Sequence, residues 1–185
     1  EEYFVKSLKI ACPNGHLGFA PIRAESFHIG VQARPDVIAA DSGSDDIGPG
    51  PLGSDTSTSP EDWQRHDLEL MLVASRQLGV PMIIGSSGDT GSNSRVDLYV
   101  RIIQELAEKH QMPQFKLGYF YSEVDKAWLK QQMARGETVQ GLDGFADLSE
   151  AELDATERVV AMAGVHPFVE LLRQGADVII GGRSS

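Results

Sequence analysis

The sequence is poor in cysteine and in long apolar runs, and each shortage excludes a class of protein. Cys12 is the single cysteine among 185 residues. One cysteine can form neither an internal disulfide nor a zinc cluster, which excludes a disulfide scaffold and fits a reducing compartment. No apolar run approaches the roughly 20 residues of a membrane-spanning helix, and no charged and then apolar leader opens the chain. We therefore expect a soluble, cytoplasmic protein without a membrane partner.

Positive charge is also scarce. Lys and Arg number 16 against 27 Asp and Glu, so the formal net charge is −11 at pH 7. A surface this acidic repels phosphate backbones and anionic lipids, and no cluster of Lys and Arg offsets it. The composition therefore predicts that nucleic acids are not partners of this protein.

The length and the apolar content fit one folded domain. At roughly 100–200 residues per domain, we expect residues 1–185 to form a single α/β domain, and 41% hydrophobic residues suffice for a core. The chain has no initiator Met, and it stops after the apolar run 176–180, where a covering helix normally follows. We therefore expect the N-terminal portion of a longer polypeptide.

Short apolar runs alternate with segments of helical period. Five runs, each followed by Gly, Ser, Asn or Asp, predict buried parallel strands at 8–11, 37–40, 82–84, 115–120 and 178–180. Apolar residues spaced three and four apart in 68–75 and 96–107 predict crossover helices. This order predicts an α/β fold, with an open, mainly parallel sheet and crossover helices on both faces.

Turn residues mark where the predicted helices begin and end. Ser59, which precedes Pro60, offers a capping hydroxyl, and Ser149 with Glu152 has the pattern of a capping box. Gly79 is typical of a helix end. Two stretches rich in Gly fit neither element: 41–59, and 136–148, which is a solvated linker or a lid.

Unusual polar residues follow the predicted strands. Because the carboxyl ends of parallel strands share one edge of the sheet, the segments that leave them should lie together. These segments are 12–16, 41–46, 85–91, 121–123 and 182–184. Turns need Gly, Asn, Asp and Ser in any protein, but that need does not explain a cysteine, a histidine, several acids and an arginine. We predict a binding or catalytic cleft at this edge.

The segment 85–91 offers backbone N–H groups and the start of a helix, which could hold an anion. Its spacing matches no dinucleotide motif, P-loop or nucleophile elbow. A small-residue turn that lets strand and helix pack closely is the alternative. Under the first interpretation the substrate-binding residues of this edge are Ser42, Gly43, Ser86, Ser87 and Gly88.

Asp41, Asp45 and Asp46 lie close together in the first long loop. Their carboxylates could bind a divalent cation or orient substrate hydroxyls, although the spacing is not that of an EF-hand and the sequence requires no cofactor. A turn role is the favoured interpretation for Asp45 and Asp46. Asp41, directly behind a strand, is a predicted catalytic residue. The histidines do not suggest a metal site.

Three further residues are candidates at this edge. Cys12 and His16 could pair as nucleophile and base, or Cys12 could be a small buried apolar residue. Glu123 could act as a general acid or base, and the alternative is a helix capped by Ser122 with acids in its first turn. Arg183 suits a bidentate grip on a carboxylate, or an ion pair with one of the acids.

The order and spacing of several motifs resemble one known family. They are Asp41-Ser42-Gly43-Ser44, Gly48-Pro49, Leu52-Gly53, Ile84-Gly85-Ser86-Ser87-Gly88, Ser122-Glu123-Val124-Asp125-Lys126 and Gly182-Arg183. From the first strand to Arg183 the sequence resembles the acyclic terpene utilisation (AtuA-like) family. The resemblance implies a longer cytoplasmic protein, and the family's link to the breakdown of branched acyclic acids implies a catabolic enzyme for carboxylates or their thioesters. It implies no role for individual residues.

Two functional hypotheses follow. The first is an enzyme, or its N-terminal part, that acts on a small carboxylic or hydroxy acid or its acyl-CoA thioester by lyase, hydratase or hydrolytic chemistry. In it, the amides of 85–91 and Arg183 hold the anionic end, Asp41 orients a hydroxyl and Glu123 moves a proton. The second is a non-catalytic α/β module that binds a metabolite or assembles with a subunit. We expect a homo-oligomer, or an association with the rest of the same chain.

Overall fold

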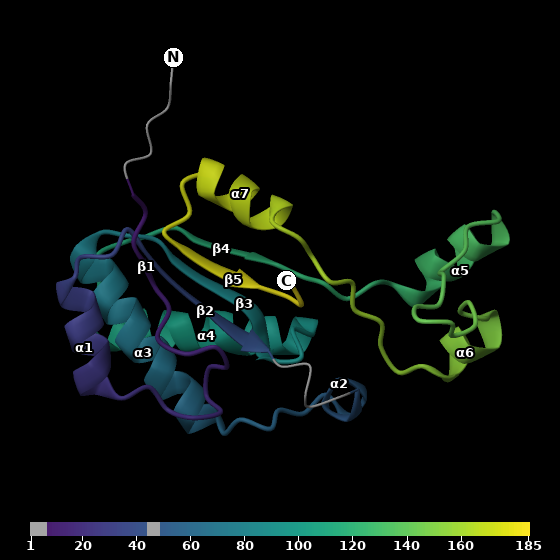
Figure 1. Cartoon of the computed structure of the whole chain (residues 1–185), viewed down its shortest axis with the longest axis horizontal. Helices are drawn as coiled ribbons and strands as arrows, with labels where there is room; N and C mark the ends of the chain where they lie inside the picture. The colour runs from purple at the N-terminus through teal and green to yellow at the C-terminus, as the bar shows by residue number, and fades with distance from the viewer. Residues whose placement is uncertain (1–6, 44–48) are drawn as a thin grey trace, which may run out of the picture.

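Five parallel strands form the centre of the structure, a computed structural model that describes residues 7–43 and 49–185 (Figure 1). The strands are β1 (Ile10–Ala11), β2 (Val37–Gly43), β3 (Met82–Asp89), β4 (Leu117–Phe120) and β5 (Val178–Gly181). Their order in the sheet is β1-β2-β3-β5-β4, and every neighbouring pair is parallel. The predicted α/β fold with its parallel sheet is confirmed.

β3 is longer than the sequence predicts. The apolar run ends at Ile84, but pairing with β2 continues to Asp89, with a shift of register between Asp41 and Gly43. Ser86 and Asp89 have positive φ angles of 47° and 73°. Left-handed residues bend a strand without ending it, so part of the expected loop belongs to the sheet.

Helices cover both faces of the sheet, as predicted. α1 (Ala24–Gln32), α3 (Glu61–Leu78) and α4 (Asn93–Lys109) lie on one face, and α7 (His166–Arg173) lies on the other (Figure 1). The chain crosses the sheet in one direction from β1 to β4 and then turns back to place β5 between β3 and β4. Right-handed crossovers put a returning connection on the opposite face, which explains the position of α7.

The main core lies between the sheet and the helices α3 and α4. Its fully buried helix side chains include Leu68, Met71, Leu72, Ile102 and Ile103. They repeat at the three-and-four spacing seen in the sequence, and each such side chain stabilises the fold by roughly 1.5–3 kcal/mol. The core therefore fixes the sheet, and with it the positions of the strand ends.

Residues 124–165, here called the arm, extend away from the sheet between β4 and β5 (Figure 1). The arm contains α5 (Lys126–Ala134) and α6 (Glu150–Ala155), and Glu123, the residue before the arm, pairs with Val160 through an isolated antiparallel bridge. Leu142 and Phe145, 80% and 79% exposed, lie in the segment predicted as a linker or lid. In the ranges 7–43 and 49–185, no helix is long and apolar enough to cross a membrane.

Candidate functional site

The carboxyl ends of β2, β3 and β5 meet at one edge of the sheet. The loop after β3 leads to α4 on one face, and the chain after β4 leads to α7 on the other. Residues 182–184, which follow β5, therefore lie between two connections that lead to opposite faces of the sheet. Open α/β sheets bind ligands at this position. The sheet order places Arg183 at this point.

Gly43, Ser86 and Arg183 approach one another closely at this edge. A Cβ added at Gly43 would lie 2.5 Å from Ser86 Cβ and 3.0 Å from Arg183 Nη1. The distance to Ser86 Cβ is one that real Cβ atoms essentially never show, so the close packing against Ser86 requires glycine at position 43. Three of the predicted site residues, contributed by three different strands or strand ends, are therefore brought together.

Asp41 lies beside this group on β2. It is exposed and pairs in register with Gly85. A Cβ added at Gly85 would lie 3.9 Å from Asp41 Oδ1 and 2.9 Å from Ser184 Oγ. The Gly43 N–H donates to Asp41 Oδ1 over 2.9 Å, which fixes the carboxylate against its own strand. The Asp41 carboxylate and the Arg183 guanidinium therefore both lie next to Gly43.

Hydrogen bonds hold the segment after β5 in place. Ser86, only 1% exposed, donates through Oγ to the Ser184 carbonyl oxygen at 3.0 Å and accepts from the Ser184 N–H at 3.2 Å. The Arg183 N–H donates to the Gly91 carbonyl oxygen at 3.1 Å, and Arg183 Nη1 donates to the Asp89 carbonyl oxygen at 3.5 Å. Arg183 is therefore set by the backbone of β3 and the turn that follows it.

The other predicted substrate-binding residues are buried toward α4. Ser42 Oγ lies 2.5 Å from the Tyr99 hydroxyl and accepts from the Gly88 N–H at 3.2 Å. Ser87 Oγ donates to the Gly181 carbonyl oxygen at 2.8 Å. Burial raises the pKa of Tyr99, so its hydroxyl stays protonated at neutral pH. These hydrogen bonds hold Ser42, Ser87 and Gly88 within the protein. Direct contact of these three residues with a substrate stays a prediction.

Several backbone N–H groups of the segment 85–91 have acceptors within the protein. The Ser86 N–H donates to Gly182, the Gly88 N–H to Ser42, and the Gly91 N–H to Ser87. The close packing of strand and turn therefore accounts for the small residues, as the alternative interpretation held. Anion binding by these amides stays a prediction.

Glu123 lies at the N-terminus of α4. Its Oε1 accepts from the Asn93 N–H at 2.8 Å, and its own N–H donates to Asn93 Oδ1 at 3.3 Å. Arg158 Nε is 3.8 Å from the same carboxylate oxygen. A carboxylate is stabilised at the N-terminal end of a helix dipole. Glu123 therefore caps α4, although it lies about 30 positions further along the chain.

The alternative interpretation, in which Ser122 caps the following helix, is wrong. Ser122 Oγ donates instead to the Arg183 carbonyl oxygen at 2.9 Å. The cap of α5 is Asp125, whose Oδ1 accepts from the Trp128 N–H at 2.6 Å. Ser122 therefore helps to hold the segment after β5.

Asp89 is the buried centre of this edge. His16 Nε2 lies 2.7 Å from Asp89 Oδ1, and donors from Ser57, Thr58 and Ser59 reach the same carboxylate at 2.5–3.2 Å. Burial opposes ionisation, but these hydrogen bonds outweigh it and lower the pKa of Asp89 below its ordinary value. An ionised carboxylate thus joins β3 to two loops.

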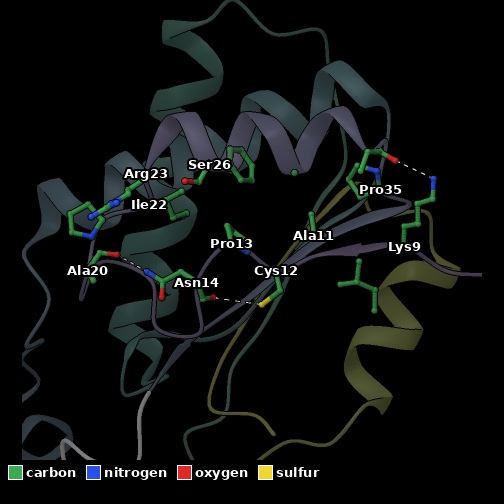
Figure 2. Close-up of a pocket in the computed structure, with 15 residues that line it drawn as sticks. Lys9, Ala11, Cys12, Pro13, Asn14, Ala20, Ile22, Arg23, Ser26 and Pro35 are labelled. Carbon is green, nitrogen blue, oxygen red and sulfur yellow. Dashed lines mark hydrogen bonds between the residues drawn. The ribbon is translucent and has the colours of Figure 1, made fainter.

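Cys12 lies apart from His16 in the contacts of the structure. The thiol is exposed, and Sγ lies 3.8 Å from the Asn14 carbonyl oxygen, whereas the His16 ring contacts Asp89. The interpretation of Cys12 as a buried apolar residue is therefore wrong. Cys12 instead lines a groove of about 780 Å³ between β1 and α1 (Figure 2). Its role as a nucleophile stays a prediction.

The proposed cation site cannot be assembled from described residues, because Asp45 and Asp46 lie outside the ranges that the structure describes. Within those ranges, no three His, Cys, Asp or Glu residues group as metal ligands would. A divalent cation at Asp41 therefore stays a prediction.

A family model described as acyclic terpene utilisation family protein AtuA matches residues 8–185. The chain belongs to this family. The match spans all five strands and the sheet edge described above, so the resemblance noted in the sequence is confirmed. No significant match was found among curated proteins or among solved structures.

Sequence reasoning missed the centre of the edge in this member of the AtuA family. Asp89 lies inside the segment that the sequence predicts to be an anion-binding turn, and the sequence suggests His16 only as a partner for Cys12. One signal was present, because Asp89 is a lone acid in a run of small neutral residues that leaves a buried strand. Such a residue needs hydrogen-bond donors from elsewhere in the fold.

Proposed function

We propose that this chain is a catabolic enzyme, or the N-terminal part of one, with a role in acyclic terpene utilisation. It acts on a small carboxylic or hydroxy acid, or on its acyl-CoA thioester, by lyase, hydratase or hydrolytic chemistry. One observation carries the proposal: the Arg183 guanidinium and the Asp41 carboxylate both border Gly43, at the switch point of an open α/β sheet.

Arg183 binds the carboxylate of the substrate in this proposal. A guanidinium can donate two parallel hydrogen bonds to a carboxylate, which fixes orientation as well as affinity. Asp41, exposed at the end of β2, orients a substrate hydroxyl. Gly43 contributes by its lack of a side chain, because any Cβ there would displace Arg183 or Ser86.

The contacts support His16 rather than Glu123 as the group that moves a proton. Asp89 can fix the tautomer and the orientation of the His16 imidazole, the arrangement that general bases commonly have. The His16 side chain is 15% exposed and keeps some access to solvent. Glu123 is committed to the first turn of α4.

Calorimetric titration with branched acyclic acids, hydroxy acids and their CoA thioesters tests the proposal, with product detection by mass spectrometry. We expect Arg183→Gln to weaken binding of carboxylates about tenfold or more, because a hydrogen bond to a charged group contributes about 1.5–3 kcal/mol. Asp41→Asn should reduce turnover with an unchanged melting temperature, since Asp41 is exposed.

Asp62→Asn is the matched control, because Asp62 is an exposed acid on α3. It should leave both quantities unchanged. Unaltered affinity in Arg183→Gln together with unaltered turnover in Asp41→Asn would remove this edge as the site.

Subunit assembly is a second candidate function, favoured by the exposed side chains of the arm. Trp128, Leu142 and Phe145 are 53%, 80% and 79% exposed. Apolar side chains gathered on one extension often mark a protein–protein contact. In this case the chain binds metabolites without turnover and associates through the arm.

A further inference from the structure

A groove of about 780 Å³ lies between β1, the loop that follows it, and α1 (Figure 2). Its volume is in the range of small-molecule sites. Apolar residues dominate the lining, among them Ile22 and Phe27, which are 7% and 5% exposed, and Pro35. Of the predicted catalytic and substrate-binding residues, Cys12 alone lines the groove. The groove is therefore separate from the edge of the sheet around Arg183.

The described part of the lining has two charged residues, and both are cations. Lys9 and Arg23 belong to it, and among residues 7–43 and 49–185 no Asp or Glu does. They lie toward opposite ends of the groove, with Cys12 between them (Figure 2). In a protein with a net charge of −11 this local balance is unusual, and it favours an anionic ligand over a cationic one.

The two cations differ in their surroundings. Lys9 Nζ donates to the Ala33 carbonyl oxygen at 3.1 Å, at the C-terminal end of α1, and the Lys9 N–H donates to Asp36. Arg23 is exposed and is the N-cap residue of α1, where the helix dipole adds positive potential. Glu25 in the first turn is the nearest acid in sequence, but it does not line the groove. An anionic group is therefore favoured at Arg23.

We infer that the groove binds an aliphatic carboxylate, with the carboxylate at Arg23 and the hydrocarbon chain along the apolar floor toward Ala33. The inference concerns a site distinct from the proposed catalytic edge and does not depend on the reaction there. Burial of hydrocarbon supplies the driving force, at about 25 cal/mol per Å², and Arg23 selects the charge of the head group.

Cys12 provides a direct readout, because it is the single cysteine, it is exposed, and it lines the groove. The experiment measures the rate at which iodoacetamide, a neutral reagent, alkylates Cys12, followed by mass spectrometry. Decanoate should slow the alkylation in a saturable way. Decyltrimethylammonium, which has the same chain length and the opposite charge, should not.

Two variants and a control locate the ligand. Arg23→Gln should raise the Kd for decanoate about tenfold, as expected for loss of a charged hydrogen-bond partner. Gly30→Leu should abolish protection, because Gly30 lines the groove and a Cβ there meets nothing within 4 Å, so the side chain enters open space. Arg173→Gln, an exposed cation on α7, should change nothing.

Three outcomes would overturn the inference. They are a Cys12 rate that decanoate leaves unchanged, equal protection by both amphiphiles, and protection that rises with protein concentration in the absence of decanoate. The second would mean non-selective apolar binding, and the third would mean that a second copy of the chain occupies the groove.

Discussion

At the scale of single residues, the Asp89 side chain connects two loops to the end of β3. Its carboxylate receives hydrogen bonds from the loop after β1, through His16, and from the segment before α3, through Ser57, Thr58 and Ser59. A buried carboxylate is costly unless donors surround it. Asp89 therefore holds two loops against the end of β3, beside the proposed site.

Asp89→Asn should lower the free energy of unfolding by about 3 kcal/mol at pH 7, because the amide leaves donors of the two loops without an acceptor. The folded-state pKa of Asp89 is below its ordinary value of 3.8. The ionised group therefore adds stability above that value, and this contribution is lost as the pH falls through the lower folded-state pKa.

Urea unfolding of both proteins at pH 7 and in steps below pH 4 measures this effect. The wild type should lose more stability on acidification than Asp89→Asn does, and Asp62→Asn should follow the wild type. Parallel pH curves for wild type and Asp89→Asn would show that the carboxylate is not stabilised as described.

The sequence predicts individual residues well where local chemistry decides their role. The capping box of Ser149 and Glu152 is present as predicted, because both partners lie within one helical turn. Ser59 does not cap α3 but donates to Asp89, 30 positions away. The sequence could not predict that contact, because nothing local specifies which distant acceptor the fold brings to a hydroxyl.

At the scale of elements, the turn between β3 and α4 depends on Gly91. Its φ is 65°, and a Cβ there would lie 2.2 Å from the Arg183 backbone nitrogen. Gly91→Ala should therefore lower the free energy of unfolding by about 3 kcal/mol. The left-handed conformation accounts for about 1 kcal/mol of this loss, and the collision accounts for the rest. The collision should also displace Arg183 and weaken carboxylate binding.

Gly79→Ala is the matched control for this prediction. Gly79 has φ 68° at the end of α3, and a Cβ there meets nothing within 4 Å. The Gly79→Ala variant should lose only about 1 kcal/mol of unfolding free energy, measured by thermal unfolding. Its affinity for carboxylates, measured by calorimetry, should not change. Equal losses in the two variants would contradict the close approach of residues 91 and 183.

The sequence also predicts the elements better than their arrangement. The five apolar runs all fall in or beside observed strands, because strands that pack against helices are locally apolar. The prediction that all five are buried is wrong for β1 and β4, which are the edge strands and have no buried residue. The insertion of β5 between β3 and β4 leaves no local signal, since any strand of the sheet presents similar backbone groups. The position of Arg183 relative to Asp41 follows from that strand order, so the sequence predicts a shared edge of the sheet but not how close the two residues lie.

At the scale of the whole molecule, the sheet and the arm differ in how much apolar surface they bury. α3 and α4 each bury several side chains in the core. Leu129 is the buried residue of α5, and Leu153 is that of α6. Local stability follows burial, so the arm should open much more readily than the sheet in an isolated chain.

Hydrogen exchange followed by mass spectrometry tests this contrast and the assembly hypothesis together. In dilute protein, amides of α5 and α6 should exchange at least tenfold faster than those of α3 and α4, because little burial opposes their opening. If Leu142 and Phe145 pack against another copy, protection of the arm should rise with protein concentration, and Phe145→Ser should abolish the rise. Tyr119→Ser, an exposed aromatic on β4 outside the arm, is the control. Slow exchange of the arm at every concentration would show that it is stable on its own, and both the contrast and this route to assembly would then fail.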